Sequence, residues 1–338
     1  MTSQDEKHMR TCFKLAQKGK GFVAPNPMVG CVILDRNKKI VSKGYHKKCG
    51  ENHAERDALL KLQNNEAEGG TLYVNLEPCS HWGKTAPCTD IIIEKKIKKV
   101  VIAMRDINPK VDGISKLKEA GIEVITGVLE DEAKFLNRVF IKNMKEQLPY
   151  TVLKTATTID GKIATNNGNS KWITGKEARE EVYRMRGEFD CIMTSSNTII
   201  ADNPRMEHKF KCILDKDLKT PKDSLIYSQG EIYIASKENT PLINGELDIR
   251  EVLKTLFSKG IYTVFVECGG TLAGSMLKEG LIDEVFQFIA PKILNDNSGM
   301  SSFNGEHAET ISQAHGLKIF ETSTFGNDLL IKALVIRK

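Results

Sequence analysis

One imidazole, one carboxylate and two thiols constrain this chain more than any other feature of its sequence. A His-Ala-Glu triplet, from His53 to Glu55, precedes two Pro-Cys pairs that end at Cys79 and Cys88. Three ligands of this kind hold zinc and leave a fourth position for water, whose pKa the metal lowers to about 7. A glutamate that does not bind the metal can shuttle that water's proton to a departing amine. The residues predict a zinc-dependent hydrolytic deaminase with His53, Cys79 and Cys88 as ligands and Glu55 as general acid/base.

The elements predicted around these residues place both cysteines near helix starts. Apolar residues at helical spacing predict a helix over residues 51–62. Residues 70–77 are predicted to form a strand that turns at Pro78, and a second apolar-periodic segment, 91–97, opens at Thr89. The start of a helix favours a thiolate over a thiol, and the thiolate is the form that binds metal.

Two plainer interpretations compete with a catalytic zinc site. The cysteines could be ordinary core residues, or Cys49 could complete a closed structural zinc site. The spacing is also unusual, because nucleic-acid and cytidine deaminases carry Pro-Cys-x-x-Cys, whereas eight residues separate Cys79 from Cys88. His81 and Lys84 lie in this insert, which suggests an anionic or phosphorylated substrate.

The composition is that of a globular protein with two domains. The chain has 338 residues, of which 40% are hydrophobic and 28% charged. Its net charge of +5 suits phosphorylated small molecules and does not require nucleic acid. No apolar run approaches the roughly 18 residues of a membrane span, and the first ten residues contain no apolar signal region. We expect a cytoplasmic protein with no membrane or nucleic-acid partner.

Alternating helical and strand patterns predict a three-layer α/β domain over residues 1–146. The expected helices are 9–19, 114–120 and a polar-faced helix at 131–145, and the expected strands are 28–34, 40–45, 99–104 and 122–126. A break at residues 147–149 predicts the domain boundary.

The second half, residues 147–338, is predicted to be another α/β domain, with strands at 150–157, 191–195, 262–267, 284–289 and 329–336. Thr174 and Glu177 form a sequence capping box that predicts a helix through Arg186, closed by Gly187. Glycines follow the strand 262–267, where a helix start can bind a phosphate. By themselves they are a weak signal, and they are not the dinucleotide fingerprint.

Taken together, these motifs identify a family. From about residue 5 to its end, the chain resembles the bifunctional deaminase–reductases of riboflavin biosynthesis. The residues that carry the resemblance are 25–30, 46, 53–55, 77–88 and 106–110 in the first half, and 154–156, 160–161, 170–174, 198, 201–204, 266–267 and 283–292 in the second.

The resemblance implies a cytidine-deaminase-like first domain and a second domain like dihydrofolate reductase. The first would use Zn²⁺ to deaminate 2,5-diamino-6-(5-phosphoribosylamino)pyrimidin-4-one. The second would use NADPH to reduce the ribosyl group to a ribityl chain. The expected partners are therefore small phosphorylated pyrimidines, and we expect a homo-oligomer.

Site residues follow from the same resemblance, position by position. The deaminase pocket would be lined by Asn26, His46, Ala54, His81, Lys84, Asp106 and Asn108. The reductase substrate would meet Lys154, Ser170, Arg186 and Glu267. NADPH would contact Ala156, Ile163, Trp172, Thr198, Asp202, Gly269, Gly270, Thr271, Leu272, Ala273, Gly274 and Ser275.

The chain departs from the family pattern in two places. Ile107 stands where the family has a proline between the Asp and Asn. After the Asn-Pro pair at residues 203–204, the family runs through a leucine to an arginine three positions on. This chain has Arg205, Met206 and Lys209 in that segment. We expect these residues to share recognition of the substrate phosphate with Arg186.

Two other classes of function stay open at this point. One is a deaminase of nucleic-acid bases with an RNA-binding second half, which would need a basic face interleaved with aromatic residues. The second half has few aromatic residues to stack on bases. The other is a structural zinc protein, in which Glu55 would be catalytically idle.

Overall fold

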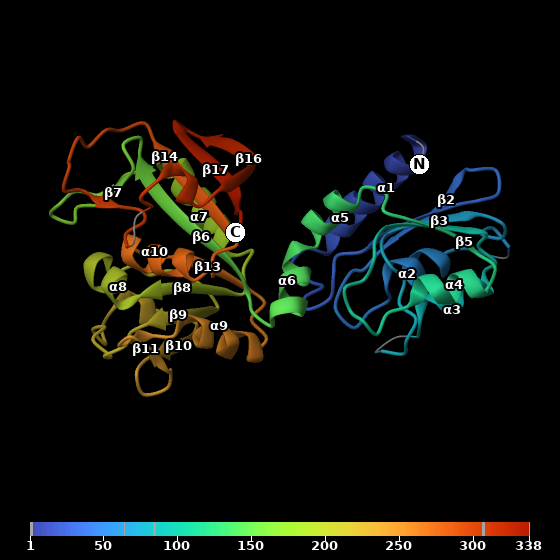
Figure 1. Ribbon diagram of the computed structural model, residues 1–338, viewed down its shortest axis with the longest axis horizontal. Coiled ribbons are helices and arrows are strands. Elements are labelled where there is room, and N and C mark those ends of the chain that lie inside the picture. Colours follow the sequence, from blue (N-terminus) through green and yellow to red (C-terminus); the bar gives the residue numbers. More distant parts are fainter. Residues whose placement is uncertain (1–2, 64, 84–85, 306–307, 338) are drawn as a thin grey trace. The chain divides into compact units, whose positions relative to one another are not determined.

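The computed structural model describes residues 3–63, 65–83, 86–305 and 308–337. Its internal contacts divide the chain into two compact units, Met1–Gln147 and Leu148–Lys338 (Figure 1). Each unit is built on its own mixed sheet with helices, which is the predicted fold class. Across the described ranges, no helix is both long and apolar enough to cross a bilayer.

The N-terminal unit contains a sheet with the strand order β2-β1-β3-β4-β5. Its strands are β1 Gly30–Leu34, β2 Ile40–Tyr45, β3 Thr71–Leu76, β4 Lys99–Met104 and β5 Glu123–Thr126. Its helices are α1 Ser3–Ala16, the short turn η1 Gln17–Gly19, α2 Ala54–Leu59, α3 Cys88–Glu94, α4 Gly113–Glu119, α5 Glu130–Leu136 and α6 Arg138–Glu146.

Two glycines show that helices cover both faces of this sheet. A Cβ atom on Gly30 would lie 2.1 Å from the Cys12 carbonyl oxygen, so α1 packs directly on that face. A Cβ atom on Gly44 would lie 2.3 Å from the Ala54 carbonyl oxygen, so α2 packs on Gly44. Gly44 pairs with Cys31, the neighbour of Gly30, and successive strand residues face opposite sides. The helices α1 and α2 therefore lie on opposite faces, which gives the predicted three layers.

Several helices of this unit differ from the sequence prediction. The helix α1 begins at Ser3, before the predicted start at residue 9, and α3 covers Cys88–Glu94 instead of the predicted 91–97. The predicted helix 51–62 is shorter, because His53 keeps an extended backbone as the residue that precedes α2. The predicted helix 131–145 is interrupted at Asn137, which separates α5 from α6. Asn137 uses its side chain on another segment: Oδ1 accepts the Met28 N–H at 2.8 Å and Nδ2 donates to the Met28 carbonyl at 3.1 Å. This long-range contact has no signature in helical periodicity.

The C-terminal unit contains an eight-stranded sheet with the order β10-β9-β8-β13-β6-β14-β17-β16. Its strands are β6 Tyr150–Thr158, β8 Cys191–Ser195, β9 Phe210–Leu214, β10 Glu231–Ala235, β13 Thr263–Glu267, β14 Glu284–Ala290, β16 Leu317–Phe325 and β17 Asp328–Val335, with the short strands β7 Lys162–Ala164, β11 Leu242–Ile243, β12 Glu246–Leu247 and β15 Met300–Ser301 outside this sheet. Its helices are α7 Lys176–Arg186, α8 Ser196–Asp202, α9 Ile249–Ser258 and α10 Gly270–Lys278, with the short turns η2 Leu225–Ser228 and η3 Ile311–Gln313.

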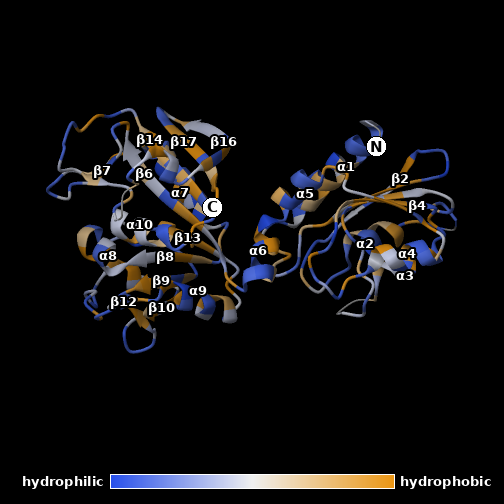
Figure 2. Ribbon diagram, viewed as in Figure 1, coloured by the Kyte–Doolittle hydropathy of each residue, from blue (hydrophilic) through white to orange (hydrophobic). Residues whose placement is uncertain are grey.

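From β10 to β14 the neighbouring strands of this sheet are parallel, and β17 and β16 extend it antiparallel. Parallel strands are typically buried on both faces and rich in apolar residues. Figure 2 shows hydrophobic (orange) stretches at β9 and β10, and every position of β9 is buried. Met193 of β8 belongs to an apolar cluster with residues of α9 and α10. Its neighbour on the same strand, Ile192, belongs to a second cluster with Ile199 of α8. In such sheets ligands bind at the carboxyl ends of the strands.

The predicted capping box before α7 is wrong. The residue that precedes α7 is Gly175, and no side chain among the described residues caps this helix start. Instead, the Gly175 N–H donates to Oδ2 of Asp328 at 2.6 Å, a residue at the start of β17. Gly187 follows the helix with a right-handed backbone (φ −66°, ψ −12°), so it does not end α7 by a left-handed turn.

Candidate active sites

The three predicted metal ligands come together in the N-terminal unit. His53 precedes α2, Cys79 follows β3 and Pro78, and Cys88 opens α3. The His53 Nδ1 atom lies 3.4 Å from the Cys79 sulfur and 3.5 Å from the Cys88 sulfur. Among the described residues, the cluster of possible ligand atoms within 4.8 Å of one another contains these three residues and not Cys49.

The two sulfurs are not equivalent. The Cys79 sulfur accepts hydrogen bonds from the Cys88 thiol and the Cys88 backbone N–H, the latter at 3.3 Å. The bond from the Cys88 thiol, together with His53, lowers the pKa of Cys79 to about 4, and the same interaction raises the pKa of Cys88. Cys79 therefore ionises first. A thiolate and an imidazole at this spacing fit zinc.

Glu55 lies beside this cluster with an unsatisfied oxygen. The side chain is 3% exposed, and within the described part of the chain its Oε2 atom accepts no hydrogen bond. Burial raises the pKa of Glu55 to about 7, although His53 opposes this shift. A buried carboxylate oxygen that accepts no hydrogen bond is costly unless a ligand supplies one. The arrangement fits a proton shuttle that acts beside a metal.

His46 and Asn26, two predicted pocket residues, form a hydrogen-bonded pair near the ligands. The His46 ring lies 5.4 Å from the His53 ring, between centroids. Burial lowers the pKa of His46, which favours the neutral ring. We infer that Nδ1–H donates to the Asn52 carbonyl at 3.1 Å and that Nε2 accepts from Asn26 Nδ2 at 3.1 Å. This pair fixes one tautomer of the ring.

Glu77, which the sequence prediction missed as a site residue, ties the loop after β4 to the end of β3. Its Oε2 accepts the Asp106 N–H at 3.3 Å and its Oε1 accepts the Ile114 N–H at 3.0 Å. Asp106 Oδ1 in turn accepts the Asn108 N–H at 2.8 Å. The available signal was an acidic residue directly before Pro78, at the end of an apolar strand.

The other predicted residues of the deaminase pocket have different surroundings. Ala54 is the first residue of α2 and is fully buried against β2. His81 is exposed in the insert between the cysteines. Lys84 lies outside the described residues.

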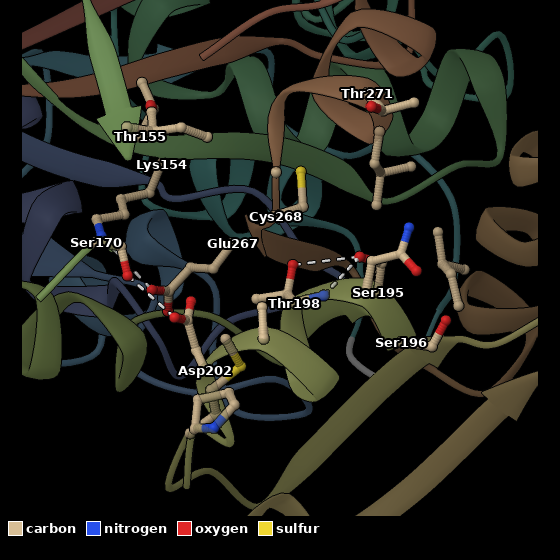
Figure 3. A pocket seen from close by; sticks show the side chains of 18 of the residues that line it. Lys154, Thr155, Ser170, Ser195, Ser196, Thr198, Asp202, Glu267, Cys268 and Thr271 are labelled. Atoms are coloured by element: carbon tan, nitrogen blue, oxygen red, sulfur yellow. Dashed lines mark hydrogen bonds and ion pairs between the residues drawn. The ribbon is translucent and has the colours of Figure 1, made fainter. Parts of the chain in front are cut away.

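The C-terminal unit holds a cavity of about 1690 Å³, large enough for more than one small ligand. The predicted residues that line it are Lys154, Ala156, Ile163, Ser170, Trp172, Arg186, Thr198, Asp202, Arg205, Met206, Glu267, Gly269, Thr271, Leu272 and Ser275. Figure 3 shows Lys154, Ser170 and Glu267 on one side of the pocket, and Ser196 and Thr271 toward the other.

Four predicted residues do not line this cavity. Ala273 is buried within α10, and Lys209 is exposed just before β9. A Cβ atom on Gly270 would lie 2.3 Å from the Ser301 carbonyl oxygen, and one on Gly274 would lie 1.7 Å from that of Asn304. The last two glycines are therefore needed for the packing of α10 against residues 301–304.

An ion-pair network around the buried Glu267 carboxylate lies at the carboxyl end of β13. The Arg186 guanidinium donates from Nε and Nη2 to the two Glu267 oxygens at 2.6 and 3.0 Å. Lys154 Nζ lies 3.7 Å from Glu267 Oε2. Burial alone would raise the pKa of Glu267, but Arg186 and Lys154 outweigh it and hold that pKa below its usual value. Burial lowers the pKa of Lys154.

The cavity also has features that fit a phosphate-containing cofactor. Gly269 precedes α10, and in the described part of the chain no side chain caps the first turn of this helix. Free backbone N–H groups at a helix start bind phosphate. On the opposite wall, Ser170 Oγ donates to Asp202 Oδ1 at 3.0 Å, and Ser195 Oγ lies 3.2 Å from Thr198 Oγ1 (Figure 3).

Known proteins match both units. Residues 2–104 match the family described as the cytidine and deoxycytidylate deaminase zinc-binding region, and residues 149–331 match the RibD C-terminal domain. The riboflavin biosynthesis protein RibD of Actinobacillus pleuropneumoniae is 37% identical, over 99% of this chain and 96% of that protein. RibD of Escherichia coli is 35% identical, over 97% and 98%.

Solved structures agree over the full length. Acinetobacter baumannii RibD superposes with a TM-score of 0.84 at 34% identity, covering 99% of both chains. The deaminase/reductase of Thermotoga maritima gives a TM-score of 0.84 at 34% identity, covering 98% of this chain and 99% of that one.

These matches confirm the predicted zinc-binding deaminase and NADPH-dependent reductase. Because the likeness spans both halves, the alternative of a nucleic-acid deaminase with an RNA-binding module has no support. The chain belongs to the RibD family, the bifunctional deaminase–reductases of riboflavin biosynthesis.

Proposed function

We propose that the N-terminal unit deaminates 2,5-diamino-6-(5-phosphoribosylamino)pyrimidin-4-one at the cluster of His53, Cys79 and Cys88. These residues would hold Zn²⁺, which supplies a reactive hydroxide at neutral pH. Glu55 takes up a proton at its carboxylate and delivers it to the departing amine. Its burial and raised pKa support this role, because a group poised near neutral pH can both accept and release a proton.

The pocket residues position the pyrimidine and its phosphoribosyl group. Asn26 and the Ala54 backbone contact the ring, while His46 and His81 face the phosphoribosyl end. The family resemblance gives the same role to Lys84, which lies outside the described residues. Asp106 and Asn108 complete the wall, and Glu77 positions their loop. The hydrogen bonds of Asn26 with His46 and of Glu77 with Asp106 support this arrangement.

The C-terminal unit would use NADPH to reduce the ribosyl group to a ribityl chain. The cofactor lies between α10 and α8, with Ala156, Ile163, Trp172, Thr198, Asp202 and the 269–275 segment beside it. Within that segment we now assign cofactor contact to Gly269, Thr271, Leu272 and Ser275, because these residues line the cavity. Lys154, Ser170 and Glu267 face the substrate.

The contacts of Arg186 and Lys209 do not favour either residue for binding the substrate phosphate. Arg186 is committed to Glu267 by two hydrogen bonds, and Lys209 does not line the cavity. Arg205 lines the cavity and has a loose 3.5 Å contact with Glu207. We therefore assign the phosphate contact to Arg205, with Met206 shaping the segment beside it.

The proposed deamination rests chiefly on one observation: beside the ligand cluster, the Glu55 Oε2 atom has no hydrogen-bond partner among the described residues. The test follows both reactions in one purified chain. Supplied with the diaminopyrimidinone phosphate alone, the protein should release ammonia. Supplied with NADPH as well, it should then oxidise NADPH and form the ribityl product. NADPH oxidation without ammonia release, or release without later oxidation, would contradict one half of the proposal.

A further inference from the structure

Within the described residues, Lys219 forms no ion pair, whereas several other cations of the reductase cavity do. Lys154 and Arg186 pair with Glu267. Lys216 pairs with Glu246 at 3.0 Å. Lys219 instead donates from Nζ to the neutral side-chain oxygen of Asn197, at 2.9 Å. Lys219, Asn197 and Ser196 all line the cavity, so this positive charge is available to a ligand there.

Two hydrogen bonds to the buried Asp215 carboxylate fix the backbone of the loop that carries Lys219. Asp215, which follows β9, is 1% exposed. Its two carboxylate oxygens accept the backbone N–H groups of Lys219 and Thr220, at 3.0 and 2.9 Å. A lysine side chain that extends from a fixed backbone loses less conformational freedom when it binds an anion.

Two acidic residues of this loop, Asp215 and Asp217, already have partners. Dinucleotide sites that prefer NADH present an acidic side chain to the ribose 2′-hydroxyl, whereas NADPH sites place a cation near the 2′-phosphate. The Asp215 carboxylate is used by backbone N–H groups, and Asp217 pairs with Lys237 at 3.0 Å. Lys216 and Asp217 also line the cavity, but each has an oppositely charged partner, Glu246 and Lys237. Lys219 is therefore the charged cavity-lining residue of this loop whose hydrogen-bond partner is neutral.

Two other cavity cations with neutral partners lie elsewhere. Lys171 contacts the carbonyl of Asp202, the last residue of α8, and Arg179 stacks on Trp172. Lys219 contacts Asn197, the second residue of α8. At about 1.5 Å per residue, roughly 8 Å of helix separates the two contact points. Ser170, the neighbour of Lys171, appears on the Glu267 side of the pocket in Figure 3, and Ser196 on the other side.

We propose that Lys219, supported by Asn197, binds the 2′-phosphate of NADPH and gives the reductase its preference for NADPH over NADH. This inference rests on the proposed position of the cofactor in the C-terminal cavity. The 2′-phosphate is the group that distinguishes the two cofactors, and a lysine is a suitable point charge for it.

The test measures binding by titration calorimetry on the full-length protein, with NADPH, NADH, 2′,5′-ADP and 5′-ADP as ligands. Lys219→Ala should raise the dissociation constants of NADPH and 2′,5′-ADP about tenfold, the effect of losing one charge-assisted contact. Those of NADH and 5′-ADP should stay as in the parent protein. Lys219→Arg should keep the preference. Lys222→Ala, an exposed lysine of the same loop that does not line the cavity, should change nothing.

Two outcomes would overturn the proposal in different ways. If Lys219→Ala weakens all four ligands equally or weakens none, Lys219 does not read the 2′-phosphate, although the cavity can still be the cofactor site. If the parent protein binds 2′,5′-ADP no better than 5′-ADP, there is no 2′-phosphate site and the proposed NADPH position fails as well. Thermal unfolding of the C-terminal unit at the parent protein's temperature shows that each variant is folded.

Discussion

At the scale of single residues, Glu55 separates proton transfer from metal binding. Glu55→Gln keeps the shape of the side chain but removes the group that accepts a proton. We expect the variant to keep zinc and to deaminate about a hundred- to ten-thousand-fold more slowly, toward the larger loss because Glu55 serves more than one transfer. Metal analysis and ammonia release measure the two effects. A rate within tenfold of the parent protein would refute the assignment.

A second residue-scale prediction concerns the buried carboxylate of Glu267. Its pKa is held below the usual value of about 4.5 by Arg186 and Lys154, so its contribution to stability is present above pH 4.5. That contribution is lost as the pH falls through the lowered pKa. We expect Glu267→Gln to destabilise the C-terminal unit by about 1.5–3 kcal/mol at neutral pH, because two half-buried cations lose a charged partner. Denaturant unfolding should show the gap between the two proteins narrowing at acid pH. A gap independent of pH would contradict the ion pair.

At the scale of elements, the position of α10 depends on its glycines. A Cβ atom at Gly274 would meet backbone atoms of Asn304, which cannot move without displacing the 301–304 segment. We expect Gly274→Ala to destabilise the C-terminal unit by about 1–3 kcal/mol and to weaken NADPH binding, measured by thermal unfolding and titration. Gly269→Ala is the matched control for stability, because a Cβ atom there meets nothing within 4 Å. Equal unfolding of both variants would show that the contact with Asn304 does not position the helix.

At the scale of the whole molecule, the two units have separate apolar cores. A fragment of residues 148–338 should therefore fold alone and reduce the deaminated substrate with NADPH, and a zinc chelator should not affect it. The same chelator should abolish ammonia release by the full chain. Circular dichroism and NADPH oxidation test the fragment. A folded fragment that binds no NADPH would place the cofactor site or the boundary elsewhere.

The sequence by itself determined the local features of this protein. The strands 40–45, 99–104 and 191–195 were predicted with the bounds that the structure has, because apolar runs and turn residues act over a few neighbours. The candidate zinc ligands were also evident, because their chemistry depends on residue type. Only the tertiary structure decided the contacts between distant segments. Asn137 breaks a helix to bind Met28, Asp328 replaces the expected cap of α7, and Glu267 joins Arg186 across 81 positions. Such contacts depend on how the sheets bring chain segments together, and a side chain's partner across the fold leaves no periodic trace in the sequence.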